Sequence, residues 1–325
     1  MKAEILAALR ETDGYVSGQD LCEKFGVSRT AIWKAINQLK LSGYEIEAVQ
    51  NRGYRIVSTP DILSENELKS IRKTKWLGNQ IHYESVMGST NTKAMQLAEE
   101  GAPHGTLVVT DKQVKGRGRR GRKWETPAGS AIAMTFLLRP EICPNNASML
   151  TLVAAMAVVK GIEAETGLRA GIKWPNDVVI NKKKVSGILT EMSAQSDYVN
   201  HIVIGIGINV HVNEFPDELK DMATSLDSEY GKEINRSALI ERICEFFEDE
   251  YEIFLQTEDL SAFVKEYNSY LVNLNQSVRV LDPKEPFEGK ARGITARGEL
   301  LVDTWESRRL VSSGEVSVRG LYGYV

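Results

Sequence analysis

The spacing of hydrophobic residues changes twice along this 325-residue chain. Up to about residue 57, apolar residues first recur at helical spacing and then alternate as in strands, whereas from residue 65 to about 271 helical and strand patterns follow one another. Beyond Asn275 only short alternating strands remain, separated by Gly and Pro. A polar, Pro-containing stretch at 58–61 marks the first change. We therefore expect an α+β multidomain protein with domains at 1–62, 63–272 and 273–325.

The first segment has the order helix, short helix, basic helix and hairpin. Its third helix is predicted to begin after the N-cap Ser28 and to stop at Gly43, and the turn Asn51-Arg52-Gly53 is typical of a hairpin. This is the order of a winged helix-turn-helix, in which the third helix enters the DNA major groove and the wing contacts the backbone. The alternative is a solvated helical face in a domain that binds no DNA. The DNA-binding candidates are Ser28, Arg29, Thr30, Lys34, Lys40, Arg52 and Arg55.

The other two domains are predicted from their helix and strand patterns. Strands are expected at 106–111, 130–138, 177–180 and 201–210, and helices at 91–100, 147–165 and 234–255. This alternation favours a central mixed α/β sheet backed by helices. Further strands are expected at 278–282, 288–294, 299–304 and 308–318, and they favour a small C-terminal β-barrel of about fifty residues.

Composition argues against several classes of protein. The longest apolar run, 149–159, is far shorter than the roughly 20 residues that cross a bilayer, so we expect no membrane-spanning helix and no membrane partner. The three cysteines are widely spaced and predict reduced thiols in the cytoplasm. The four histidines lack metal-binding spacing, so no structural metal is expected. A net charge of -4 argues against general coating of nucleic acid, but it allows a local basic patch.

The segment 116–124, GRGRRGRKW, is the most informative candidate for ligand binding. Its glycines allow the backbone to approach an anion closely, and its arginines carry planar forks that hold carboxylate or phosphate groups. Trp124 can stack on a purine or pack on an alkyl chain. A basic loop that binds nucleic acid or is simply solvated is the alternative. Because the segment lies between apolar strands, a ligand loop is favoured.

Three other segments have residue types suited to chemistry. In KWPND, at 173–177, Asn176 can bind a phosphate or ribose, and Asp177 can hold a divalent cation or orient an amine. Lys184, on the strand after the next turn, can place its charge on a phosphoryl group, although a solvated turn is the alternative for the lysines at 182–184. The segment 88–91, GSTN, either caps a helix or also contacts a polar ligand. Neither the dinucleotide-binding glycine fingerprint nor a P-loop is present.

The segments GSTN at 88–91, GRGRRGRKW, KWPND, KVSGI at 184–188 and GIGINV at 205–210 together resemble the biotin protein ligase family. With the N-terminal winged helix, the chain is similar to the bifunctional members that also repress a biotin operon. The resemblance implies a catalytic domain like those of class II aminoacyl-tRNA synthetases and an SH3-like C-terminal barrel. It also implies the reaction: biotin and ATP form biotinyl-5′-AMP and pyrophosphate, and the biotinyl group passes to a lysine of a biotin carboxyl carrier domain.

The same resemblance implies roles for individual residues. The catalytic residues implied are Lys184, Arg117, Arg119 and Asp177. Those implied for biotin are Ser89, Thr90, Asn91, Gln113, Gly116, Arg117, Lys184 and Gly187. Those implied for ATP and the adenylate are Arg119, Arg120, Arg122, Trp124, Asn176 and Asn209. Mg²⁺ is expected with ATP. Two roles stay open for Asp177: contact with Mg²⁺, or help for the incoming lysine of the carrier. The loop at 212–225 is expected to fold over the adenine, and a homodimer holding biotinyl-AMP is expected to bind operator DNA.

Two alternatives from other functional classes stay open. A lipoate or octanoate ligase shares the catalytic fold and the reaction type, although 116–124 followed by KWPND fits the biotin branch better. A winged-helix regulator that senses a metabolite without ligase activity explains the first domain, but it gives Arg119, Lys184 and Asp177 no common task.

Overall fold

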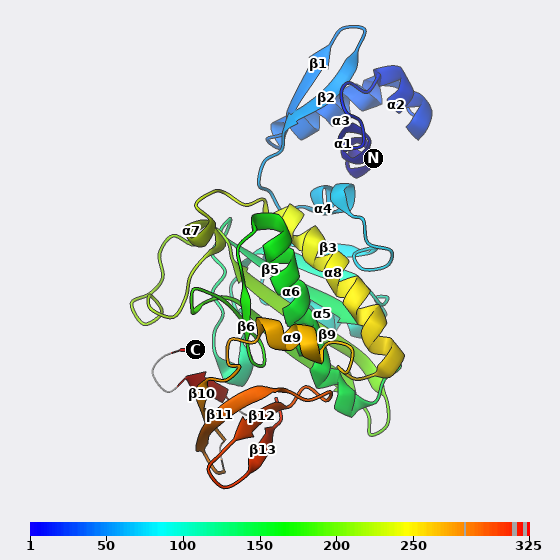
Figure 1. Cartoon of the computed structure of the whole chain (residues 1–325). Coiled ribbons are helices and arrows are strands. Elements are labelled where there is room, and N and C mark those ends of the chain that lie inside the picture. The colour runs from blue at the N-terminus through cyan, green and yellow to red at the C-terminus, as the bar shows by residue number, and fades with distance from the viewer. Residues whose placement is uncertain (283, 314–316, 321–323) are drawn as a thin grey trace.

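The computed structural model describes all residues except 283, 314–316 and 321–323. Its three parts follow one another from top to bottom in Figure 1: a small N-terminal domain, a larger α/β domain and a small β domain. The α+β multidomain architecture predicted from the sequence is confirmed.

The N-terminal domain is a winged helix-turn-helix. It contains α1 (Lys2–Arg10), α2 (Gly18–Phe25) and α3 (Arg29–Leu41), followed by the antiparallel hairpin of β1 (Glu45–Val49) and β2 (Gly53–Ser58). The Ser28 hydroxyl accepts the hydrogen bond of the Ala31 amide and so caps α3 as predicted. Gly53 has φ +108°, and a Cβ there would lie 2.0 Å from the Val16 carbonyl oxygen, so the turn end of the wing requires glycine.

The central domain is built on a seven-stranded mixed sheet in the order β3-β4-β5-β9-β8-β7-β6. The strands are β3 (Ile81–Met87), β4 (Thr106–Gln113), β5 (Ala131–Leu138), β6 (Gly171–Lys173), β7 (Asp177–Ile180), β8 (Lys183–Ala194) and β9 (Val199–Asn209). The β3–β4 pair is parallel and the other neighbours are antiparallel. The sequence analysis missed the two edge strands, β3 and β6. Three residues make β6, too few to produce a periodic pattern.

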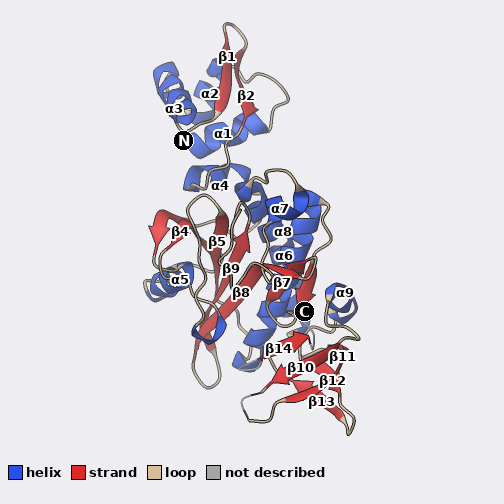
Figure 2. Ribbon diagram, turned by 90° about the vertical axis from the view of Figure 1, so that its left-hand side faces the viewer, coloured by secondary structure: helices blue, strands red, loops and turns tan. Residues whose placement is uncertain are grey.

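Helices cover both faces of this sheet. The long helices α6 (Leu150–Thr166) and α8 (Arg236–Thr257) lie on one side of the sheet and α5 (Thr90–Glu99) on the other (Figure 2). The shorter helices are α4 (Glu65–Ile71), α7 (Leu226–Tyr230) and α9 (Val264–Tyr270), with 3₁₀ turns η1 (Arg119–Gly121) and η2 (Pro144–Met149). The segment 144–166 is long and apolar enough to cross a membrane by composition, but 78% of its most apolar window is buried, as in the core helix of a globular domain.

The C-terminal domain is an antiparallel five-stranded sheet in the order β13-β12-β11-β10-β14. Its strands are β10 (Ser277–Leu281), β11 (Phe287–Ile294), β12 (Leu300–Asp303), β13 (Arg308–Val311) and β14 (Ser317–Gly320). The single strand expected at 308–318 is wrong: β13 pairs with β12, whereas β14 pairs with β10 at the other edge. The chain therefore changes edges between them, which alternation of apolar residues cannot reveal.

Candidate active site

A cavity opens on the central sheet between the start of α5, the loop at 113–124 and strands β8 and β9. It gathers segments that lie up to 118 residues apart, because the lining extends from residue 89 to residue 207. The residues that line it are Ser89, Thr90, Asn91, Gln113, Arg117, Gly118, Arg119, Trp124, Asn176, Lys184, Gly187, Ile188, Leu189, Gly205, Ile206 and Gly207.

Glycines form the floor of this cavity. Gly205 and Gly207 lie on one face of β9, and Gly187 pairs with Gly207 from β8. A Cβ on Gly205 would lie 2.1 Å from Oδ1 of Asn91, and one on Gly207 would lie 2.4 Å from the Trp124 indole. The side chains of Asn91 and Trp124 therefore lie directly against the sheet at positions where glycine leaves no side chain in the way. The position of Gly205 and Gly207 on the cavity floor was not predicted. Glycine at alternate positions of a strand could have indicated it, because such glycines mark a close approach of other groups.

The start of α5 forms one wall. Ser89 is at the N-cap position, but its side chain makes no capping hydrogen bond and lies 6% exposed in the cavity wall. The amide and hydroxyl of Thr90 donate to Gln113 Oε1 at 2.9 and 3.2 Å. Asn91 donates to the Leu189 carbonyl oxygen at 3.1 Å and accepts from the Thr135 hydroxyl at 2.8 Å. This wall therefore presents a fixed set of short polar side chains.

The arginine-rich loop forms the opposite wall. It folds back on itself, since the Trp124 amide donates to the Gly116 carbonyl at 3.0 Å and a Cβ on Gly116 would lie 2.1 Å from the Trp124 carbonyl oxygen. Arg119 donates to Asn176 Oδ1 at 2.9 Å and to the Ser313 carbonyl of the C-terminal domain at 2.6 Å. The indole Nε1 of Trp124 is buried and has no hydrogen-bond partner among the described residues. This N–H group is available to donate a hydrogen bond to a ligand atom in the cavity.

Lys184 and Asp177 form an ion pair at the rim of the cavity, with side chains 26% and 15% exposed. The second carboxylate oxygen of Asp177 accepts a 2.5 Å hydrogen bond from the hydroxyl of Tyr324. Burial alone would raise the pKa of Asp177, but Lys184, Tyr324 and Lys173 together hold that pKa below its ordinary value. Burial lowers the pKa of Lys173 to about 8. Asp177 is therefore a carboxylate with both oxygens engaged.

Most of the predicted ligand residues meet in this cavity. Those that line it are Ser89, Thr90, Asn91, Gln113, Arg117, Arg119, Trp124, Asn176, Lys184 and Gly187. The cavity lining does not include the other five, which are Gly116, Arg120, Arg122, Asp177 and Asn209. Arg120 and Arg122 are exposed, whereas Asn209 is 7% exposed and donates to the Thr224 carbonyl at 3.1 Å. Asn209 thereby holds the far end of the loop at 212–225.

A magnesium ion held by the protein alone does not fit this arrangement. Both oxygens of Asp177 already have partners, Lys184 and Tyr324. The described part of the chain contains no group of three or more His, Cys, Asp or Glu side chains placed to hold a metal. The expected contact between Asp177 and Mg²⁺ would need one of those partners to leave.

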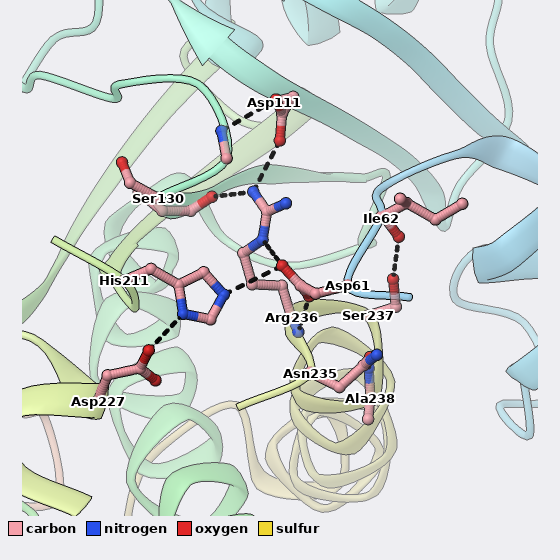
Figure 3. Close-up of polar contacts among 12 residues, drawn as sticks. Asp61, Ile62, Asp111, Ser130, His211, Asp227, Asn235, Arg236, Ser237 and Ala238 are labelled. Atoms are coloured by element: carbon pink, nitrogen blue, oxygen red, sulfur yellow. Dashed lines mark hydrogen bonds and ion pairs between the residues drawn. The ribbon is translucent and has the colours of Figure 1, made fainter. Parts of the chain in front are cut away.

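The linker between the first two domains is hydrogen-bonded to the start of α8 and to a residue just after β9 (Figure 3). Asp61 accepts hydrogen bonds from the Arg236 amide at 2.7 Å and from the Arg236 Nε at 2.6 Å, and it lies 3.0 Å from Nε2 of His211. Arg236 also donates to Asp111 at 2.7 Å, and Nδ1 of His211 lies 2.6 Å from Asp227. His211 lies two residues after the end of β9, so the linker contacts the residue that precedes the loop at 212–225.

The predicted DNA-binding residues lie on α3 and the wing. Thr30, Lys34 and Lys40 are exposed, and Arg29 donates to Gln19 Oε1 at 2.9 Å. In the wing, Arg52 and Arg55 lie 4.4 and 5.0 Å from the centroid of the Tyr15 ring. The sequence analysis did not name Trp33, which is 57% exposed on α3.

Three family models match successive parts of the chain. Residues 2–55 match an HTH domain, residues 83–209 match the biotin/lipoate A/B protein ligase family, and residues 274–319 match the biotin protein ligase C-terminal domain. The first range extends from α1 to the first half of β2, and the last extends from β10 to the penultimate residue of β14. The order of the models is the order of the three structural parts.

Full-length relatives and solved structures agree with these matches. The chain is 43% identical over 306 residues to the bifunctional ligase/repressor BirA of Bacillus subtilis, covering 94% of each chain. It is 27% identical over 314 residues to the protein of that name from Escherichia coli, covering 97% of this chain and 96% of that one. The structure of biotin protein ligase from Aquifex aeolicus in complex with biotin and ATP superposes with a TM-score of 0.66 at 32% identity, covering 74% of this chain and 99% of that one. This chain therefore belongs to the biotin protein ligase family, among its bifunctional ligase/repressors.

Proposed function

We propose that this protein is an ATP-dependent biotin protein ligase that also represses transcription. It converts biotin and ATP to biotinyl-5′-AMP and pyrophosphate, and then transfers the biotinyl group to a lysine of a biotin carboxyl carrier domain. The observation that best supports this proposal is the single cavity that gathers the start of α5, the arginine-rich loop and Lys184. The Aquifex aeolicus relative, which superposes on most of the chain, was solved with biotin and ATP bound.

The side chains around the cavity suit the two halves of an acyl adenylate. Ser89, Thr90 and Gln113 offer short polar groups for the fused rings of biotin, and Trp124 offers an aromatic face and one free donor. Lys184 lies beside the glycine floor, where its charge offsets the repulsion between the biotin carboxylate and the α-phosphate as they meet. Arg119 holds the loop to the C-terminal domain and supplies a guanidinium for the phosphate.

Further roles follow from the same proposal. Arg117 and Asn91 complete the biotin pocket with Gly116 and Gly187. The nucleotide is held by Arg120, Arg122, Asn176 and Asn209. To reach it, the two exposed arginines and the loop at 212–225 must move toward the cavity. Mg²⁺ enters on the phosphates of ATP, as part of the substrate, because Asp177 has no free oxygen for it.

The winged helix supports the second activity, binding to operator DNA. We propose that α3 lies in the major groove and that Arg52 and Arg55 of the wing contact phosphates. Dimers read two half-sites and gain affinity from the second contact, so a homodimer formed with biotinyl-AMP is the expected repressor.

We also propose a cytoplasmic location and domain boundaries after residues 62 and 272. The carrier domain is that of a biotin-dependent carboxylase, as the name of the Paracoccus denitrificans relative indicates for that protein.

Pyrophosphate release with different acids tests the ligase proposal. The purified protein should release pyrophosphate from ATP with biotin, and lipoate or octanoate should not replace biotin. Release with lipoate alone would identify the protein as a lipoate ligase. Operator binding without release for any of these acids would identify a regulator that has no ligase activity.

A further inference from the structure

One side chain of the C-terminal domain reaches the charged residues at the cavity rim. The Tyr324 hydroxyl donates a 2.5 Å hydrogen bond to Oδ2 of Asp177, and Lys173 Nζ lies 3.3 Å from the centroid of the Tyr324 ring. Lys173 is only 5% exposed, so its ammonium has lost most of its water and the ring face is one of its remaining partners. Tyr324 thus contacts two charged residues of the catalytic domain at once.

The sheet register explains why one aromatic side chain can do this. Lys173 on β6 and Asp177 on β7 are directly paired across the strands, so both side chains project from the same face. Asp177 is in turn paired with Gly187 on β8, where the absent side chain leaves space that Lys184 fills. The contacts therefore form a continuous chain from Tyr324 through Asp177 to Lys184 at the cavity.

The C-terminal domain packs against the hairpin formed by β6 and β7. The buried indole of Trp174 donates to the Gly298 carbonyl at 3.0 Å, and the Trp174 amide donates to Asn273 Oδ1 at 3.0 Å. Arg119 of the arginine-rich loop also donates to the Ser313 carbonyl of the C-terminal domain at 2.6 Å. These bonds restrict how the C-terminal domain sits against the site, so that the Tyr324 contact is part of a larger interface.

We propose that Tyr324 is a positioning residue of the ligase: it fixes the Asp177 carboxylate and the Lys173 ammonium, and thereby keeps Lys184 directed at the point where carboxylate and α-phosphate meet. Tyr324 acts through Asp177 and touches no substrate. The inference rests on the proposed role of Lys184. It makes docking of the C-terminal domain a condition for a complete catalytic site, because the hydroxyl comes from beyond β14.

The variant Tyr324→Phe isolates the hydroxyl, because it keeps the ring beside Lys173. Without its second partner the Asp177 carboxylate can rotate, and Lys184 rotates with it. Single-turnover formation of biotinyl-AMP should slow about tenfold, as expected when a catalytic group is displaced by a fraction of an ångström. The KM for biotin should stay unchanged. Tyr324→Ala, which also removes the ring, should be slower still. Tyr198→Phe, at an exposed position in the β8–β9 turn, is the matched control and should match the parent.

A double-mutant cycle separates positioning through Asp177 from a general structural role. In an Asp177→Ala background the change Tyr324→Phe should slow adenylation no further. A second tenfold loss there, a parental rate in Tyr324→Phe, or a loss confined to KM would each overturn the inference. Lys184→Ala distinguishes the two levels of failure. If that variant is slow and Tyr324→Phe is not, only the role of Tyr324 fails; if Lys184→Ala is as fast as the parent, the proposed role of Lys184 fails as well.

Discussion

Replacing Asp61 by alanine should weaken the junction between the winged helix and the catalytic domain. Arg236 is the residue most affected. Its backbone amide and its Nε each lose a hydrogen bond, and its side chain, which is 3% exposed, loses one of its two carboxylate partners. His211 keeps Asp227, but loses its contact with the linker.

The size of the effect follows from burial. Removing one partner of a fully buried ion pair typically costs about 3–5 kcal/mol. Asp61 is 28% exposed and Arg236 retains Asp111, so we expect the free energy of unfolding to fall by about 2 kcal/mol, below that range. Asp217→Ala is the control: its side chain is 90% exposed and pairs with Lys220 within one turn, and it should leave stability unchanged.

Urea unfolding at pH 7, followed by circular dichroism, measures this difference from the transition midpoint and slope. The Asp61→Ala midpoint should be lower and the Asp217→Ala midpoint should equal that of the parent. Equal midpoints for all three proteins would show that the linker contact contributes nothing, and would refute the reasoning about the junction.

Four further results are expected. The hydrogen bond to Asp61 raises the pKa of His211 above its ordinary 6.5, and together with Asp227 it outweighs the opposing effect of burial. The charged imidazole therefore stabilises the junction below pH 6.5, and this stability should be lost as the pH rises through the raised pKa. Urea midpoints at pH 6 and pH 9 would detect the loss, and equal midpoints would contradict it. Lys184→Ala should slow single-turnover adenylation about a hundredfold or more, and an unchanged rate would remove Lys184 from the chemistry. Arg119→Gly, which opens the bonds to Asn176 and Ser313, should let biotinyl-AMP escape and label bovine serum albumin; labelling of the carrier alone at the parental rate would contradict this role. Deletion of 1–59 should remove DNA binding but leave a folded ligase. This ligase should be more stable than the protein lacking 1–62, because Asp61 and Ile62 accept hydrogen bonds from α8. Equal stability of the two truncated proteins would show that these hydrogen bonds contribute nothing.

Much of the fold was predictable because its elements have strong periodic patterns or clear caps. The sequence predicted α3 from Ser28 and an apolar stripe, and it predicted the buried strands β5 and β9 from their apolar runs. It could not predict the short edge strand β6 or the change of edges between β13 and β14. Those depend on partners far away in the sequence, and no local pattern identifies a partner.

The site was predictable in its residue types but not in its assembly. The unusual glycine and arginine content of 116–124 identified that loop, and the resemblance of KVSGI at 184–188 identified Lys184. Tyr324 was missed because a single tyrosine carries no motif, and its contacts with Lys173 and Asp177 form only where β6, β7 and the C-terminal domain meet. The linker was predicted to separate two domains, yet Asp61 joins them. Glu67, 1% exposed, likewise accepts hydrogen bonds across the junction from Arg10 at 2.8 Å and from the Tyr44 hydroxyl at 2.5 Å.

Titration of operator DNA, with sedimentation in parallel, tests most directly the central claim that the product made in this cavity controls DNA binding. The account predicts tight binding and a dimer when biotin and ATP are supplied together, and weak binding with either alone. It also predicts that a non-hydrolysable biotinyl-AMP analogue restores tight binding to Lys184→Ala, and that unmodified carrier domain weakens binding by consuming the adenylate in the parent. Equal DNA affinities and an unchanged monomer fraction under all of these conditions would contradict it.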